Sequence, residues 1–124
     1  MPGDGLPRFR AGRNISLKVP VDRLEETVTF YRDVLGLPVH TTERGTHWVE
    51  FGPMRLWLDP VPQRALPELW LEVVADDLDA AARHLARHGV PRRDAVEPLP
   101  PGFSGFWISN PAGVVHLVCE PDGD

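Results

Sequence analysis

Large aromatic side chains form the most informative chemical pattern in this sequence. The chain has four tryptophans, and strand alternation places each on the face opposite the side that packs against helices, namely Trp48, Trp57, Trp70 and Trp107. Indole rings on a concave sheet stack on flat ligands and offer N–H donors, so the pattern predicts a pocket for an aromatic or flat small molecule. The alternative is that some rings are buried at a dimer interface or between parts of the chain.

Other groups on the same predicted face could act on a ligand. Glu50 and Glu72 stand beside aromatic residues that could desolvate their carboxylates and suit them to a general-base role. The commoner alternative is that they are ordinary exposed strand glutamates. The proline-rich segment 97–105 is too long for a simple hairpin. We expect it either to cover a binding cleft, with Phe103 against the ligand, or to act as a stiff connector.

Two similar stretches of chain must position these side chains. Each begins with a strand, at residues 14–19 and 69–74, and continues with a helix, at residues 24–35 and 77–88, that a glycine ends. Alternation and turn signals predict three further strands after each helix, at 37–41, 46–51 and 54–59, and at 90–95, 105–109 and 114–119. Two copies of such a βαβββ unit are too few for a solenoid, so they must pack on each other.

The repeat predicts a single α+β domain at residues 14–121. We expect residues 1–13 to be a mobile tail, because they are rich in glycine, proline and arginine. Module one would span 14–59, a proline-rich linker 60–67, and module two 68–121.

Composition limits the classes of partner. The formal net charge of -5 argues against a nucleic-acid binder, which needs a surplus of basic residues on one face. No stretch has the apolar length of a membrane span or the apolar core of a secretory signal, so we expect a cytoplasmic protein. Cys119 is the one cysteine and lies in an apolar run, which is typical of a small buried side chain.

Three motifs resemble the vicinal oxygen chelate superfamily, which includes glyoxalase I, bleomycin-resistance proteins and extradiol dioxygenases. They are the segment FYRDVLGL at 30–37, the helix opening DDLDAA at 76–81, and the turn NPAG at 110–113 before the last strand. The resemblance covers about residues 14–121 and implies paired βαβββ modules whose sheets curve around a cleft, usually completed by a homodimer. It implies little about the reaction, because members share the scaffold and differ in chemistry.

In metal-dependent members of this superfamily, four cleft positions supply His, Glu or Gln to a divalent cation. Strand parity matches them to Asn14 (with Ser16 beside it), Asp59 (with Trp57 beside it), Trp70 and His116. Of these, only Asp59 and His116 are ordinary metal ligands, so the resemblance implies a degenerate site. A variant site from Asp59, His116, Glu72 and Glu50 for Zn, Ni, Mn, Fe or Mg remains an alternative. His116 is also the histidine that we select as a proton carrier.

Three functions follow, and the sequence leaves open whether the protein is an enzyme. The first is a metal-free small-molecule binder of the bleomycin-resistance kind, with no cofactor and with ligand contacts from Asn14, Ser16, Glu50, Phe103 and the tryptophans. The alternative is a divalent-metal-dependent glyoxalase, lyase or extradiol dioxygenase that uses Asp59 and His116 as ligands. A third, metal-independent lyase or isomerase would use Glu72 or His116 as its base.

Overall fold

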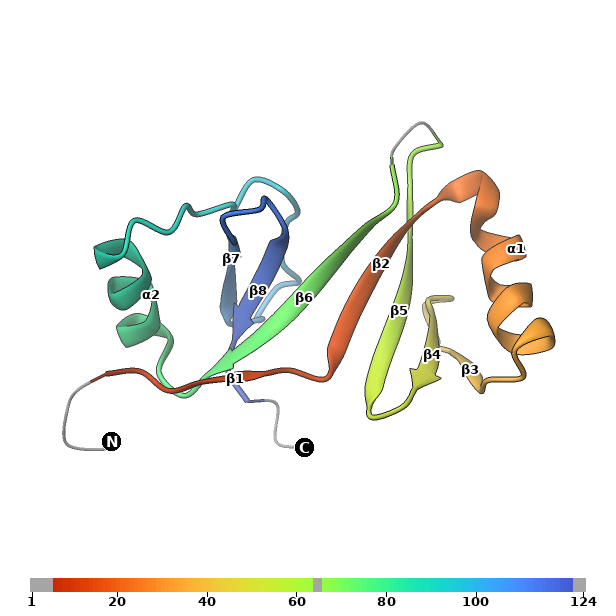
Figure 1. Cartoon of the computed structure of the whole chain (residues 1–124), viewed down its shortest axis with the longest axis horizontal. Helices are drawn as coiled ribbons and strands as arrows, with labels where there is room; N and C mark the ends of the chain where they lie inside the picture. Colours follow the sequence, from red (N-terminus) through yellow and green to blue (C-terminus); the bar gives the residue numbers. More distant parts are fainter. Residues whose placement is uncertain (1–5, 64–65, 122–124) are drawn as a thin grey trace. The chain divides into compact units, whose positions relative to one another are not determined.

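The computed structural model describes residues 6–63 and 66–121 and confirms an α+β fold (Figure 1). The chain divides into two compact units. The first holds residues 13–70, and the second holds the chain up to residue 12 together with the chain from residue 71. Each unit combines β-strands with one helical stretch, as the repeated pattern predicts.

The first unit is built on a mixed sheet. Strand β2 runs parallel to β5 on one side and antiparallel to the start of β6 on the other, while β4 and β3 extend the sheet beyond β5. The bounds are β2 Asn14–Pro20, β3 Val39–Thr41, β4 His47–Phe51, β5 Met54–Val61 and β6 Glu68–Ala75. The segment that the sequence assigns to a linker at 60–67 therefore begins inside β5.

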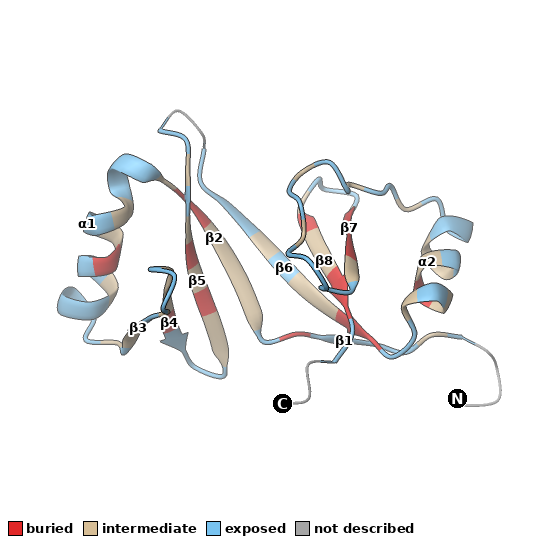
Figure 2. Cartoon of the chain, turned by 180° about the vertical axis from the view of Figure 1, so that it is seen from behind, coloured by how far each residue is buried: buried red, intermediate tan, exposed pale blue. Residues whose placement is uncertain are grey.

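One helical stretch covers a single face of this sheet (Figure 1). It consists of η1 (Val21–Arg23), α1 (Leu24–Thr29) and the π-helical η2 (Phe30–Val34). Val28 of α1 packs with alternate residues of three strands into the core, which holds Val19, Val28, Val49, Leu56 and Leu58. Figure 2 shows this buried seam on α1, β2 and β5. The stretch ends at Gly36, whose φ of 70° is a left-handed conformation that favours glycine.

The second unit has a smaller sheet with its own helix. The end of β6 pairs with β1 (Phe9–Ala11) on one side and with β8 (Val115–Cys119) on the other, and β7 (Gly105–Ser109) flanks β8. Helix α2 (Leu78–Arg87) begins where the Asp77 side chain accepts a hydrogen bond from the Ala80 N–H at 3.0 Å. The core of the second unit is formed by Ala75, Ala81, Phe106, Ile108 and Val118.

Two elements of the second unit differ from the sequence-based prediction. The expected strand at 90–95 does not form, and in the described chain this segment contributes one isolated bridge between Arg92 and Ile108. The Asp94 side chain of this segment accepts a hydrogen bond from the Trp107 backbone N–H at 3.2 Å. This side-chain contact takes the place of a backbone hydrogen bond between strands. Strand β1 was not predicted and lies inside the proposed tail 1–13, where Phe9 pairs with Ala75.

Nowhere in the part of the chain that the structure describes is a helix long and apolar enough to cross a bilayer.

Candidate functional site

Aromatic and polar side chains share the face of the first unit's sheet that points away from α1. Because residues paired across strands lie on one face, the register aligns His40, Trp48, Trp57, Ser16 and Trp70 in a single row across the sheet. Flanking rows hold the remaining members, Glu50, Arg55 and Asn14 on one side and Asp59, Lys18 and Glu68 on the other. We call this set the tryptophan face.

Three rings of the tryptophan face form a continuous aromatic platform. The imidazole of His40 stacks on Trp48, with ring centres 4.3 Å apart and an angle of 25° between the planes. Trp48 and Trp57 follow at 5.9 Å and 37°. The guanidinium carbon of Arg55 lies 5.8 Å from the centre of the Trp48 ring, within the range of a cation–π interaction. Such a surface can hold a flat ligand by stacking.

A polar cluster lies beside this platform. The Trp57 indole N–H donates to Asn14 Oδ1 at 2.7 Å, and the Ser16 hydroxyl donates to Asp59 Oδ2. Lys18 Nζ lies 3.4 Å from the same carboxylate oxygen and 3.8 Å from the centre of the Trp70 ring. The Lys18 side chain is only 5% exposed, against 33% for Asp59. The cluster therefore holds an ion pair whose cation is almost completely removed from water.

These contacts do not fit the divalent metal that the superfamily resemblance implies. The Asn14 oxygen is engaged by an indole N–H, and the Asp59 carboxylate already faces the ammonium of Lys18. Trp70 supplies only an N–H donor and cannot bind a metal. Within residues 6–63 and 66–121, no three or more His, Cys, Asp or Glu side chains come together as a metal site. A buried ammonium and a divalent cation would compete for one carboxylate.

The structure places His116 on a different face from the one predicted. His116 pairs with Leu71 and Ile108, and it shares its side of β8 with Val118, which packs in the α2 core. The prediction that His116 faces away from the helix is therefore wrong, and Leu117 takes that side beside Glu72. The error has a physical cause: β8 is apolar on both faces, so alternation alone does not show which face is inward.

The other predicted residues of the second unit make local contacts. The Trp107 indole N–H donates to the Glu97 carbonyl at 2.9 Å, and the side chain is buried under that segment. Glu72 accepts a weak contact from the Cys119 thiol at 3.7 Å. Phe103 is 44% exposed. Their proposed ligand contacts, and a role of Glu72 as base, remain predictions.

Four members of the tryptophan face were not predicted as site residues: Lys18, His40, Arg55 and Glu68. Alternation along 14–19 already places Lys18 on the same face as Asn14 and Ser16, so that signal was present in the sequence. The positions of His40 and Arg55 depend on the register of the hairpins, which pairs His40 with Trp48 and Arg55 with Glu50.

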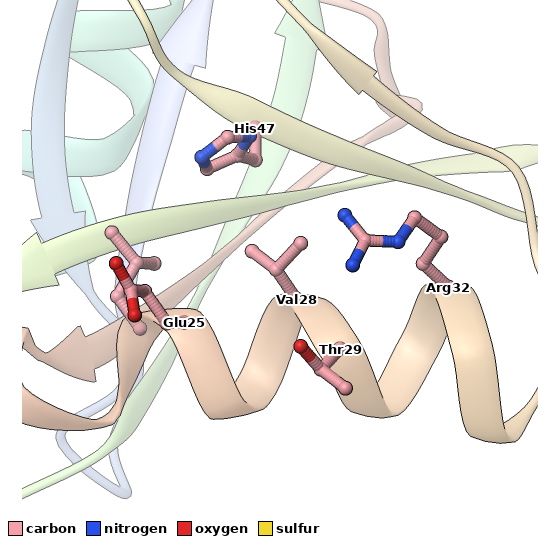
Figure 3. Close-up of a pocket in the computed structure, with 6 residues that line it drawn as sticks. Glu25, Val28, Thr29, Arg32 and His47 are labelled. Atoms are coloured by element: carbon pink, nitrogen blue, oxygen red, sulfur yellow. The ribbon is translucent and has the colours of Figure 1, made fainter.

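A separate groove of about 450 Å³ lies on the α1 side of the same sheet (Figure 3). It is lined by Leu24, Glu25, Val28, Thr29, Arg32 and His47. His47 therefore points away from the tryptophan face. Arg32 is already paired with Asp33, through Nε at 2.9 Å and a terminal nitrogen at 3.0 Å.

The Arg32–Asp33 pair predicts a specific titration. The hydrogen bond from Arg32, reinforced by charge attraction, lowers the pKa of the Asp33 carboxyl below its ordinary value. Arg32→Gln should therefore raise this pKa toward the ordinary value of an aspartate, as followed by NMR of the carboxyl carbon. A depressed native pKa stabilises the fold above the unfolded pKa, and that contribution is lost as pH falls through the native value. An unchanged Asp33 pKa in the variant would contradict the assignment.

Comparisons with known proteins agree with this architecture. A family model described as a glyoxalase-like domain matches residues 16–119. No curated protein matches the chain by sequence. Among solved structures, the Mn(II)-bound glyoxalase from Novosphingobium aromaticivorans is similar at a TM-score of 0.66 and 21% identity, over 93% of this chain and 40% of that one.

Two dioxygenases are also similar in structure. The 2,2',3-trihydroxybiphenyl 1,2-dioxygenase from Sphingomonas wittichii has a TM-score of 0.59 and 23% identity, over 88% of this chain and 40% of that one. The homoprotocatechuate 2,3-dioxygenase from Brevibacterium fuscum, in complex with 3,4-dihydroxyphenylacetate, has a TM-score of 0.63 and 21% identity, over 93% of this chain and 37% of that one. The chain thus spans well under half the length of these structures, and at such identities the likeness establishes the fold alone.

Proposed function

Because the chain belongs to the glyoxalase-like domain family of the vicinal oxygen chelate superfamily, we propose that it binds a flat or aromatic small molecule on the tryptophan face, without a metal ion. The observation that carries this proposal is the Lys18–Asp59 ion pair beside Trp70. It places a side-chain ammonium at the carboxylate that a metal would need. The function then resembles that of the bleomycin-resistance proteins, which the sequence motifs also resemble.

The aromatic platform supports the class of ligand. The rings of His40, Trp48 and Trp57 already stack or lie close to one another, and a flat ligand ring could stack on the same surface. Asn14, Ser16 and Asp59 at the edge of the platform supply polar groups that could orient the ligand. A few polar groups beside an apolar surface are typical of small-molecule sites.

A neutral aromatic probe, 4-nitroanisole, tests this proposal. We expect it to shift the indole N–H signals of Trp48 and Trp57 in ¹H–¹⁵N NMR spectra and to leave the signal of Trp107 in place. Trp48→Leu should weaken binding about three- to tenfold, because it removes aromatic stacking worth about 0.5–1.5 kcal/mol. Phe51→Leu is the matched control, since Phe51 lies on the same strand and contacts Tyr31 on the opposite face.

Two outcomes would contradict the proposal. Shifts confined to Trp107, or equal affinity in both variants, would remove the tryptophan face as the site. One tightly bound metal ion per chain that is lost in Asp59→Ala would instead support the second candidate, a metal-dependent enzyme. That candidate is favoured by the likeness to a Mn(II)-bound glyoxalase.

A further inference from the structure

His40 and Glu50 form an acid–base pair at one end of the aromatic platform. His40 lies on β3 and Glu50 on the neighbouring β4, where the Glu50 backbone N–H donates to the Pro38 carbonyl at 3.0 Å and fixes the register. The two side chains are therefore diagonal neighbours on one face. Their Nε2 and Oε2 atoms are 2.5 Å apart. Side-chain exposures of 45% and 49% leave both groups accessible to a ligand.

This contact determines which ring nitrogen can act. A carboxylate accepts a hydrogen bond, so the Nε2 atom that faces Glu50 carries the proton in the neutral ring. The Nδ1 atom then presents a lone pair, and within the described chain it makes no hydrogen bond. Stacking on Trp48 holds the plane of the ring. A histidine oriented by a carboxylate, with its second nitrogen open, has the arrangement of a general base.

We propose that His40, oriented by Glu50, accepts a proton from an acidic O–H group of the flat ligand on Trp48 and Trp57. The inference rests on the proposed function and adds the chemical class of the ligand, a conjugated ring with an ionisable hydroxyl. The ligand O–H bond breaks, its electron pair stays on the oxygen, and a new N–H bond forms at His40 Nδ1. Glu50 then faces an imidazolium cation instead of a neutral ring.

Charges around the pair are consistent with this transfer. On β4, which pairs with β3, and on the next strand β5, the charged side chains of the tryptophan face are Glu50, Arg55 and Asp59. Glu50 is the carboxylate in direct contact with the His40 ring, at 2.5 Å. The guanidinium of Arg55, 5.8 Å from the Trp48 ring, favours an anionic ligand over a neutral one.

The probe 4-nitrophenol reports the transfer directly, because its phenolate absorbs visible light and the phenol does not. At the pKa of the free probe, which lies above that of an ordinary imidazole, we expect the ratio of phenolate to phenol to be at least about threefold higher in the bound probe than in solution, equivalent to about half a pKa unit. His40→Gln should bind the probe but return its phenolate fraction to the value in solution. Glu50→Gln should reduce the excess, and His47→Gln, on the opposite face of the neighbouring strand, should retain it.

The two probes separate failure of this inference from failure of the proposed function. If 4-nitroanisole shifts the indole signals but 4-nitrophenol shows no excess phenolate, the role of His40 is overturned and the binding site stands. Excess phenolate that persists in His40→Gln would also overturn it, and would assign the effect to the charge of Arg55. If neither probe binds, both proposals fail. Thermal unfolding of each variant verifies that it is folded.

Discussion

Asp59→Ala should lower the free energy of unfolding by about 3 kcal/mol, because it removes the carboxylate that faces a lysine almost completely excluded from water. Lys18 Nζ lies 3.4 Å from Asp59 Oδ2, and a side chain that is 5% exposed cannot recover that interaction from solvent. Because Asp59 is itself one-third exposed, the expected loss is at the lower end of the range for buried pairs. Urea unfolding followed by tryptophan fluorescence measures it.

A second substitution and a matched exposed pair make this test specific. Lys18→Met in the Asp59→Ala background should restore much of the lost stability, because it removes the buried charge as well. Glu26→Gln should cost less than about 0.5 kcal/mol, since Glu26 and Arg23 form a pair at the surface. Equal effects of Asp59→Ala and Glu26→Gln would show that the lysine is solvated in solution and that the argument against a metal fails.

Leu58→Ala should destabilise the chain by about 3 to 5 kcal/mol, the usual cost of emptying a fully buried leucine site. Leu58 is 0% exposed and lies in the core between the first unit's sheet and α1. It also stands between Trp57 and Asp59 on β5, so its packing holds two members of the tryptophan face in position. Differential scanning calorimetry should show the loss as a large fall in Tm.

An exposed leucine provides the comparison. Leu66 is 81% exposed, so Leu66→Ala should change the free energy of unfolding by less than about 0.5 kcal/mol. If Leu58→Ala were equally mild, the core of the first unit would be loosely packed and could not fix the geometry of the site.

The elements with strong periodicity were predictable from sequence. Residues 14–19 alternate clearly, and the apolar residues of the first helix recur at helical spacing, so both elements were identified. Alternation along β5 likewise puts Trp57 and Asp59 on the face predicted for them, opposite the core residues Leu56 and Leu58. For half-buried strands, one apolar face is enough information to orient the strand.

Elements that depend on tertiary contacts were not predictable. Strand β1 is three residues long and forms because β6 offers it an edge, so it has no pattern of its own. The segment at 90–95 reads VPRRDA and has no clear alternation, and its Asp94 side chain accepts a hydrogen bond from the Trp107 backbone N–H instead of leaving that group to a strand partner. His116 was predicted on the wrong face because β8 is apolar on both faces. Val115 and Leu117 on one face are as apolar as Val118 on the other, which packs in the α2 core.

In the candidate site, the positions of the residues were more predictable than the contacts between their side chains. The resemblance pointed to four positions for a metal, and three of them, Asn14, Asp59 and Trp70, do lie on the tryptophan face. What the sequence could not show is that Lys18 folds back on Asp59 and Trp70, since this depends on the conformation of a long side chain.

Strand β3 is the edge of the first unit's sheet and is only three residues long. Such strands open locally at a fraction of the free energy that unfolds the whole domain. Each opening would carry His40 away from Glu50 and from Trp48, while Trp57 and the polar cluster on β2 and β5 stay paired in the interior of the sheet. The two indole rings and the proton acceptor His40 would therefore have different lifetimes: a ligand could remain stacked on Trp57 while His40 leaves and returns.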